Sequence, residues 1–184
     1  MQGNAPDSID WRPKLVNPIK NQGQCGSCWA FSAVATMEGA WFKKSGSLVS
    51  LSEQQLVDCD TAEDQGCNGG LPSNAINYVI ANKGDDTEAS YPYTARDGSC
   101  HFDAANVGAT FTKLVQVESK SEEALKTATA TIGPISVGID ASHFSFQLYS
   151  GGVYHSIFCS QTRCLSMGLS IIKLINLSID QYVS

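Results

Sequence analysis

A glycine-rich turn that carries two cysteines and runs directly into a helical pattern constrains this chain more than any other feature. Residues 22–32 read Gln-Gly-Gln-Cys-Gly-Ser-Cys-Trp-Ala-Phe-Ser, so Cys28 falls in the first turn of the helix. The N–H groups of a first turn have no partner within the helix, and the positive end of the helix dipole lies there. Both favour a thiolate over a thiol, and the thiolate is the nucleophilic form of cysteine. Cys28 is therefore the candidate nucleophile.

The first half of the chain has the apolar spacing of helices. The spacing predicts a helix over residues 29–44, with Gly46 suited to close it. Residues 52–55, Ser-Glu-Gln-Gln, form a capping-box signature that opens a second helix. A third helix is predicted over residues 72–83, because proline stands at its start and Gly84 follows its end.

The pattern changes after Cys100. Residues 111–117 and 135–140 are rich in β-branched side chains and partly alternating, which predicts strands. A short helix is predicted between them, over residues 121–132. A helical half is thus followed by a strand-rich half.

Four motifs in register make the chain resemble the papain-like cysteine proteases, the cathepsin L type in particular. Cys25-Gly26-Ser27-Cys28-Trp29 fits the family signature around the nucleophile, C-G-[SA]-C-[WY]. The others are Asp10-Trp11-Arg12, Gly66-Cys67-Asn68-Gly69-Gly70, and Phe-Gln-Leu-Tyr-Ser-Gly-Gly-Val-Tyr over residues 146–154. The resemblance runs from about Ala5 to about Arg163 and then stops.

The resemblance implies an α+β fold of the papain-like two-lobe type, with the active site in the cleft between the lobes. We expect a peptidase domain over residues 1–163 and a tail unlike the family over residues 164–184. Within that domain we expect a helical lobe over about 13–110. A strand-rich lobe, a partial β-barrel incomplete at the C-terminus, is expected over about 111–163 plus the N-terminal segment.

The amino-acid composition limits the kinds of binding partner and the cellular compartment that we expect for this chain. The net charge of −6 argues against nucleic acid or an anionic membrane as a partner. No apolar run reaches the roughly 18 residues of a membrane span, and the residues after Met1 do not resemble a signal peptide. Seven cysteines indicate an oxidising compartment, and the resemblance implies a lysosomal, vacuolar or secreted protein. No cofactor or metal is expected, and the resemblance implies a monomer that binds peptide or protein substrates and cystatin-like inhibitors.

Cysteine spacing leaves the disulfide connectivity open. The resemblance implies pairs Cys25–Cys67 and Cys59–Cys100, with Cys28 free. Cys159 matches a family cysteine whose partner lies beyond the similar region, and Cys164 matches none. A different interpretation takes the CxxC of residues 25–28 as a small redox or zinc module. A redox dithiol would leave Cys67 without a partner, and zinc would need two further ligands.

Cysteine-dependent peptide hydrolysis needs an oxyanion hole and a substrate groove as well as a nucleophile. The resemblance gives Gln22 the oxyanion role, through its side-chain amide beside the Cys28 N–H. It also pairs the backbone of an extended substrate with Gly69 and Gly70. The residues that line the main specificity pocket in the family correspond to Leu71, Pro72 and Gly138, and the small Gly138 predicts a preference for bulky apolar residues such as Leu or Phe.

The general base is missing from the position that the resemblance predicts. The family histidine should follow Cys159 by several residues, and Met167 stands there with one inserted residue allowed. A thioether cannot accept a proton at any useful pH. His101, His143 and His155 occupy loop or strand-end positions that do not match the family base. The orienting Asn and its Asn-Ser-Trp-Gly segment are absent as well.

A shifted reading frame would explain the tail. If residues 164–169 are encoded TGC TTG AGC ATG GGG TTA, the frame that starts at the last base of the Cys codon encodes Leu-Glu-His-Gly-Val. Four of these five residues fit the family motif around the histidine. We therefore hypothesise a frameshifted gene model of a complete protease, with natural truncation as the rival. A second functional class stays open, a catalytically inactive homologue that binds peptides or inhibitors through its cleft.

Overall fold

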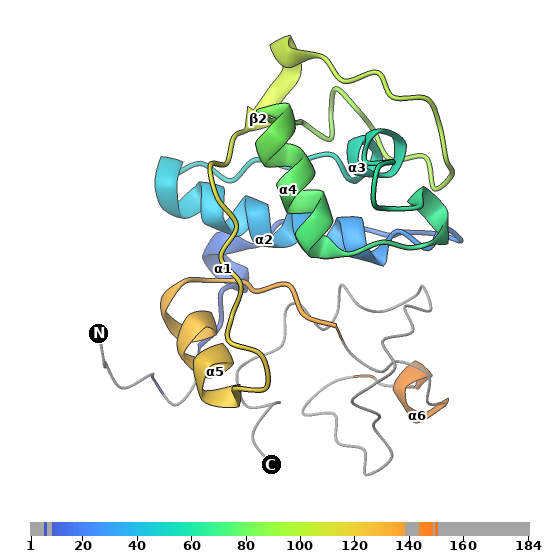
Figure 1. Cartoon of the computed structure of the whole chain (residues 1–184). Coiled ribbons are helices and arrows are strands. Elements are labelled where there is room, and N and C mark those ends of the chain that lie inside the picture. The colour runs from blue at the N-terminus through green and yellow to red at the C-terminus, as the bar shows by residue number, and fades with distance from the viewer. Residues whose placement is uncertain (1–5, 7–8, 139–143, 149, 151–184) are drawn as a thin grey trace.

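Helix α2 is the centre of the structure, and the other elements are arranged around it (Figure 1). The computed structural model describes residue 6, residues 9–138, residues 144–148 and residue 150. The elements along the chain are α1 Arg12–Leu15, α2 Cys28–Ser45, α3 Glu53–Cys59, the 3₁₀ turn η1 Gly66–Asn68, α4 Pro72–Asn82, β1 Asp85–Asp86, the 3₁₀ turn η2 Ala104–Asn106, β2 Val107–Ala109, α5 Glu122–Thr131 and α6 Phe144–Gln147.

The predicted helix ends are found in α2 and α3. Gly46 closes α2 in the left-handed conformation, with φ 76°, and its N–H donates to Phe42 O. Ser52 caps α3, because its Oγ accepts from the Gln55 N–H at 3.0 Å. The same device opens α5, where Ser121 Oγ accepts from the Ala124 N–H. These caps satisfy N–H groups that the helix itself leaves unpaired.

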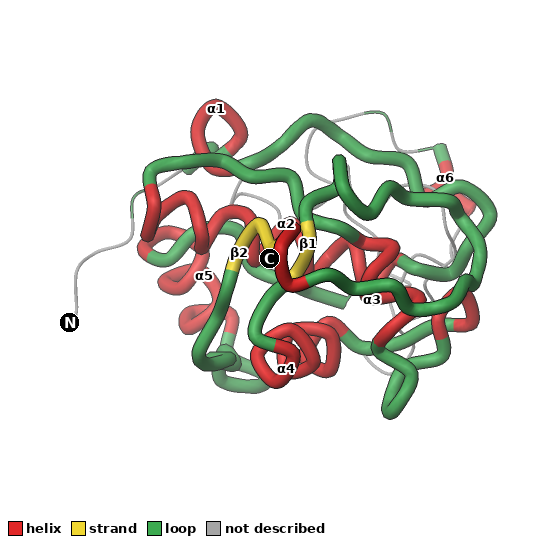
Figure 2. Tube along the Cα trace, turned by 90° about the horizontal axis from the view of Figure 1, so that it is seen from above, coloured by secondary structure: helices red, strands yellow, loops and turns green. Residues whose placement is uncertain are grey.

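The end of α4 differs from the prediction in one residue. Lys83, not Gly84, takes the left-handed conformation, with φ 66°. Gly84 is needed for another reason, since a Cβ there would lie 2.6 Å from the Val107 side chain on β2. The glycine therefore admits the close approach of β1 and β2, which lie side by side in Figure 2.

The two strands predicted after Cys100 are wrong within the described residues. Residues 111–117 and 135–138 have no strand structure, and residues 139–140 lie outside the described part. The one sheet that the described residues form joins β1 to β2, with Asp85 opposite Ala109. A β-branched pattern becomes a strand only where a neighbour completes its hydrogen bonds, and no described segment does so for 111–117.

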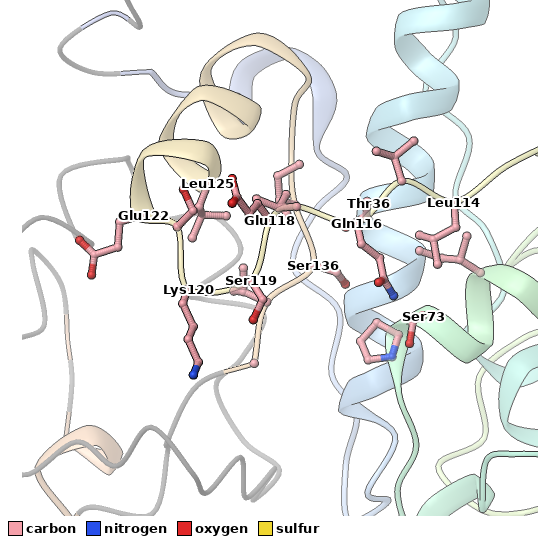
Figure 3. Close-up of a pocket in the computed structure, with 18 residues that line it drawn as sticks. Thr36, Ser73, Leu114, Gln116, Glu118, Ser119, Lys120, Glu122, Leu125 and Ser136 are labelled. Atoms are coloured by element: carbon pink, nitrogen blue, oxygen red, sulfur yellow. The ribbon is translucent and has the colours of Figure 1, made fainter.

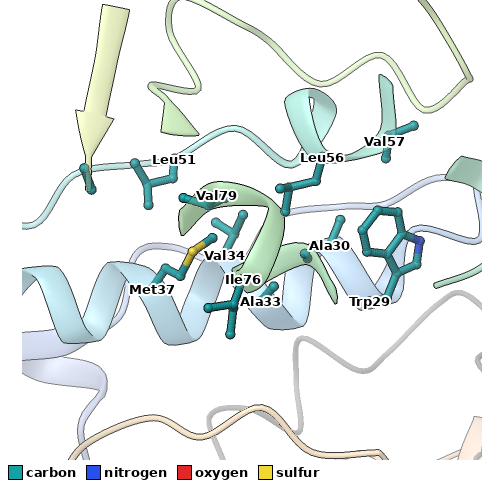
Figure 4. Packing of buried hydrophobic residues seen from close by; sticks show 12 residues of the cluster. Trp29, Ala30, Ala33, Val34, Met37, Leu51, Leu56, Val57, Ile76 and Val79 are labelled. Atoms are coloured by element: carbon teal, nitrogen blue, oxygen red, sulfur yellow. The ribbon is translucent and has the colours of Figure 1, made fainter. Parts of the chain in front are cut away.

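The main hydrophobic core lies between α2, α3 and α4 (Figure 4). From α2 come Trp29, Ala30, Ala33, Val34 and Met37; facing them are Leu51, Leu56, Val57, Ala75, Ile76, Val79 and Ala109. Burying one such side chain fully contributes about 1.5–3 kcal/mol, so this cluster is the main source of stability for the helical part.

The opposite side of α2 contacts the chain that follows α5. Pro134 packs so closely on Gly39 that a Cβ there would lie 2.9 Å from Pro134 Cδ. Ser32 Oγ and Ser136 Oγ are 2.6 Å apart, and Lys43 Nζ donates to the Ile132 carbonyl at 2.7 Å. Helix α2 is therefore shared by the helical core and by the segment over residues 132–138.

Candidate active site

Cys28 is the first residue of α2 and has a free thiol. Its side chain is 7% exposed. The turn before it is fixed by the Cys25–Cys67 disulfide and by a 2.8 Å hydrogen bond from the Gly26 N–H to Cys67 O. A Cβ at Gly26 would collide with that same carbonyl, so only glycine fits there. The Cys28 thiol is thus held at the positive end of the α2 dipole.

Tyr93 joins the two sides of the turn that carries Cys28. Its hydroxyl donates to the Gln22 carbonyl at 2.9 Å and so accepts from Ser27 Oγ. Its ring packs edge-on against Phe31, with the centroids 4.8 Å apart. Burial raises the pKa of Tyr93, so the phenol stays protonated and keeps both bonds. No local pattern in the sequence indicates these two hydrogen bonds of Tyr93.

Gln22 lies in the same turn, and its side chain is buried. Its Nε2 donates to the Cys25 carbonyl at 2.9 Å, which fixes the direction of the amide. A primary amide carries two N–H bonds, so one remains for a further acceptor. The Gln22 side chain therefore places an amide N–H donor of fixed orientation in the loop that leads to Cys28.

The segment of Gly69, Gly70 and Leu71 runs past Trp29, and the Gly69 N–H and carbonyl are bonded to Gly66 O and to the Gln65 N–H. Gly69 has φ 117°, and a Cβ added to it would meet nothing within 4 Å. A Cβ on Gly70 would lie 2.7 Å from Trp29 Cδ2, so this residue packs directly on the indole. Trp29 is fixed in turn, because its Nε1 donates to Gly66 O at 3.0 Å. An extended peptide could pair with Gly70 instead, whose backbone groups are in no hydrogen bond with the described residues.

A cavity of about 740 Å³ lies between α4, α2 and the segments on either side of α5 (Figure 3). Two of the predicted pocket residues, Pro72 and Gly138, line it. Leu71 does not, and its side chain is 59% exposed. Other lining residues include Ile76, Leu114, Leu125 and Val137. An apolar side chain of a ligand would find matching walls here.

None of the histidines is placed near Cys28 by a described contact. His101 is exposed, stacks on the Tyr91 ring with centroids 3.6 Å apart, and has its Nδ1 3.0 Å from Ser99 O. It belongs to the loop of the Cys59–Cys100 disulfide, which the structure also contains. His143, His155 and Met167 lie outside the described residues, as do Cys159 and Cys164.

The CxxC pair is not a dithiol in this structure. Cys25 is bonded to Cys67, and Cys28 is free. Among the residues that the structure describes, no group of three His, Cys, Asp or Glu side chains could hold a metal ion. The redox and zinc interpretations therefore have no support in the geometry.

No helix in the described residues is both long and apolar enough to cross a bilayer.

The site can be compared with known proteins. The sequence model described as "Papain family cysteine protease" matches residues 5–174, a range that continues past Arg163. "Digestive cysteine proteinase 1" of Homarus americanus is 58% identical over 164 residues, which are 86% of this chain and 51% of that protein. "Cathepsin L" of Sarcophaga peregrina is 56% identical over 159 residues, which are 85% of this chain and 47% of that protein.

Solved structures give the same grouping. The digestive procathepsin L2 proteinase from Tenebrio molitor larval midgut superposes with a TM-score of 0.83 at 41% identity. The match covers 89% of this chain and 52% of that one. The chain spans about half the length of the curated relatives it matches. The two-lobe α+β fold expected from the sequence is confirmed by these matches, and the boundary at Arg163 stays a prediction.

Proposed function

The chain belongs to the papain family of cysteine proteases, and on that premise we propose that the complete protein is an endopeptidase whose nucleophile is Cys28. One observation carries the proposal. Of the five cysteines in the described residues, four form two disulfides, and the remaining thiol stands at the N-terminus of α2. A lone thiol at that position lies beside the unpaired backbone N–H groups of the first helical turn.

The chemistry that we propose is acyl transfer in two stages. The Cys28 thiolate attacks the carbonyl carbon of the scissile peptide and forms a C–S bond, and the carbonyl oxygen becomes an oxyanion. The free N–H of Gln22 Nε2 and the Cys28 backbone N–H stabilise that charge, a contribution worth about 10²–10³-fold per donor in other enzymes. The carbonyl re-forms as the C–N bond breaks, and the amine takes up a proton, which a general acid would supply in the complete protein and water supplies otherwise. A water molecule then adds to the thioester carbonyl, the C–S bond breaks, and a carboxylic acid and the Cys28 sulfur are released.

We propose that the substrate binds as an extended peptide along Gly69 and Gly70. The open space beside Gly69 supports this, because a Cβ there would meet no atom of the described residues within 4 Å. Pro72 and Gly138 would receive an apolar side chain such as Leu or Phe at one end of the cavity. Leu71, exposed beside them, would cover the mouth of that pocket. Peptide and protein substrates, and cystatin-like inhibitors that fill the same groove, are the partners of this proposal.

The proton for the leaving amine has no source among the described residues at Cys28. We propose that Met167 occupies the place of the family histidine through the frameshift set out above, and that the protein as written is close to inactive. Lack of general acid–base catalysis alone would lower the rate by about 10²–10⁴-fold. The two disulfides support an oxidising compartment, lysosomal, vacuolar or secreted. An inactive, peptide-binding homologue is the alternative function.

A peptidyl epoxide with Leu at the pocket position tests the proposal, with Cys28→Ala as control. We expect labelling of the unaltered chain at Cys28 and none of the variant. Hydrolysis of a Leu- or Phe-containing peptide should be negligible until Ser166→Asp, Met167→His and Leu169→Val are combined with a family-like C-terminus bearing Asn. Hydrolysis by the unaltered chain that Cys28→Ala abolishes would show that another histidine acts as base, and His155 would be mutated first. Labelling that survives Cys28→Ala would refute the nucleophile.

A further inference from the structure

Two aspartates lie together beneath the segment of Gly69, Gly70 and Leu71. Asp60 closes α3 and Asp64 lies four residues on, and their side chains are 5% and 4% exposed. The two carboxyl groups lie within hydrogen-bonding reach of each other. Asp60 Oδ2 and Asp64 Oδ2 are buried and find no other partner in the described part of the chain. A hydrogen bond between two carboxyl groups requires that one of them holds a proton.

Asp64 also holds the glycine segment in place. Its Oδ1 accepts from the Leu71 N–H at 2.9 Å and from Asn74 Nδ2 at 3.1 Å. A Cβ at Gly70 would lie 2.7 Å from Asp64 Cγ and equally close to Trp29 Cδ2. The Asp64 carboxyl and the Trp29 indole therefore both pack closely on Gly70. Movement of Asp64 would release both the Leu71 amide and the Gly70 backbone.

Two further titratable groups act on Asp60 or are affected by it. Glu63 on the same loop adds a third carboxylate, and Tyr78 lies on α4. Burial, followed by the hydrogen bond to Asp64, raises the pKa of Asp60 to about 7. The shared proton is therefore present in acid and is lost as the pH rises through neutrality.

We propose that Asp64 is a positioning residue that holds the peptide-binding segment against Trp29, and that its contact with the buried Asp60 makes this hold depend on pH. Loss of the proton leaves two buried like charges in contact, and one carboxylate must turn towards water. When Asp64 turns, the Leu71 N–H loses its acceptor. The inference rests on the proposed function in one respect, that this segment binds the peptide.

The test compares two reagents on the same thiol. A peptidyl epoxide needs the segment to dock, whereas iodoacetamide reads only the reactivity of Cys28, so the ratio of their labelling rates isolates docking. For the unaltered chain we expect this ratio to fall about tenfold or more between pH 5.5 and pH 8.5, the loss expected when a hydrogen bond to a charged group is broken. Ionisation of Cys28 alters both rates and cancels in the ratio.

Variants separate the proton from the hydrogen bond. Asp60→Asn supplies a permanent N–H donor to Asp64, so its ratio should stay at the acid value at every pH. Asp64→Ala should give the low ratio at every pH. Asp97→Asn is the matched control, because Asp97 accepts from the Cys67 N–H at 2.7 Å in the same region without belonging to the pair. This control should follow the unaltered chain.

Hydrogen exchange at the Leu71 amide gives a second measurement that needs no peptide. Its protection factor should fall with rising pH in the unaltered chain and stay constant in Asp60→Asn. If Asp60→Asn keeps the full pH dependence of both measurements, the positioning role is overturned, even if Asp64→Ala fails to fold. If the unaltered chain shows no preference for the peptidyl reagent at any pH, the proposed function is overturned instead.

Discussion

Asp85 is the residue whose replacement should stabilise this protein most clearly. It is the first residue of β1, its side chain is 0% exposed, and neither carboxyl oxygen has a hydrogen-bond donor among the described residues. Burial, with the nearby charge of Glu53 as the next cause, raises its pKa well above the ordinary 3.8. A buried polar group without a partner costs about 1–3 kcal/mol.

We expect Asp85→Leu to raise the free energy of unfolding by about 1–3 kcal/mol, because it removes the unpaired carboxyl and keeps a side chain of similar length. A chain of this size gains roughly 2–4 °C in Tm per kcal/mol. The gain should depend on pH. Since the folded-state pKa of Asp85 is raised, its protonated form is stable in acid, and the cost of the residue grows as the pH rises through that pKa. The gain should therefore be larger at pH 8 than at pH 5.

Thermal unfolding followed by tryptophan fluorescence measures the effect, since Trp29 belongs to the adjacent core and Trp41 packs against it. Asp86→Leu is the control. Asp86 is buried as well, but its Oδ2 accepts from the Asp103 N–H at 3.2 Å, so the same substitution should lower Tm. A melting temperature of Asp85→Leu at or below that of the unaltered chain at pH 8 would refute the argument and show that Asp85 has a partner.

Four further outcomes are expected. Lys20→Met should lower the free energy of unfolding by about 3–5 kcal/mol at high pH, because Lys20 Nζ lies 2.8 Å from the buried Glu53 carboxylate. Urea unfolding that shows the same loss of stability at pH 5 and at pH 8.5 would contradict this. Tyr93→Phe should lower the free energy of unfolding by about 1–2 kcal/mol and speed labelling of the Cys28 thiol by iodoacetamide, since the turn loses two hydrogen bonds. An unchanged labelling rate would show that Tyr93 does not hold the turn in place. Gly70→Ala should reduce peptidyl epoxide labelling but not iodoacetamide labelling, because its Cβ would lie 2.7 Å from the indole. With the pKa of Glu53 raised to about 8 and that of Asp60 to about 7, stability is present in acid and lost as the pH rises through these values, so the chain should melt higher at pH 5 than at pH 8.5.

The helices were predictable because their signals are local. A serine before a helix accepts from the N–H three residues on, whatever the rest of the fold does, and Ser52 and Ser121 both do so. The position of Cys28 at the start of α2 follows from a different local signal, the glycine-rich turn before it, since Ser27 makes no side-chain cap. The pairing of Cys25 with Cys67 came from family resemblance, because spacing alone allows other connectivities.

The strands and the buried carboxyl groups were beyond local reasoning. Residues 111–117 have a strand-like composition, but a strand depends on a partner that composition does not specify. Asp60 and Asp64 read as polar loop residues, and only the fold shows that both are buried in contact. Tyr93 lies 66 residues from Ser27 along the chain, so the bond between them could not be found from spacing.

The two disulfides overlap along the chain. One joins residues 42 positions apart and the other 41, and the stretch from Cys59 to Cys67 belongs to both loops. Any single backbone cut between Cys25 and Cys100 therefore leaves the two pieces covalently joined. In surroundings rich in proteases, a nicked molecule would keep its mass and its core packing, and the cut would become visible only on a reducing gel.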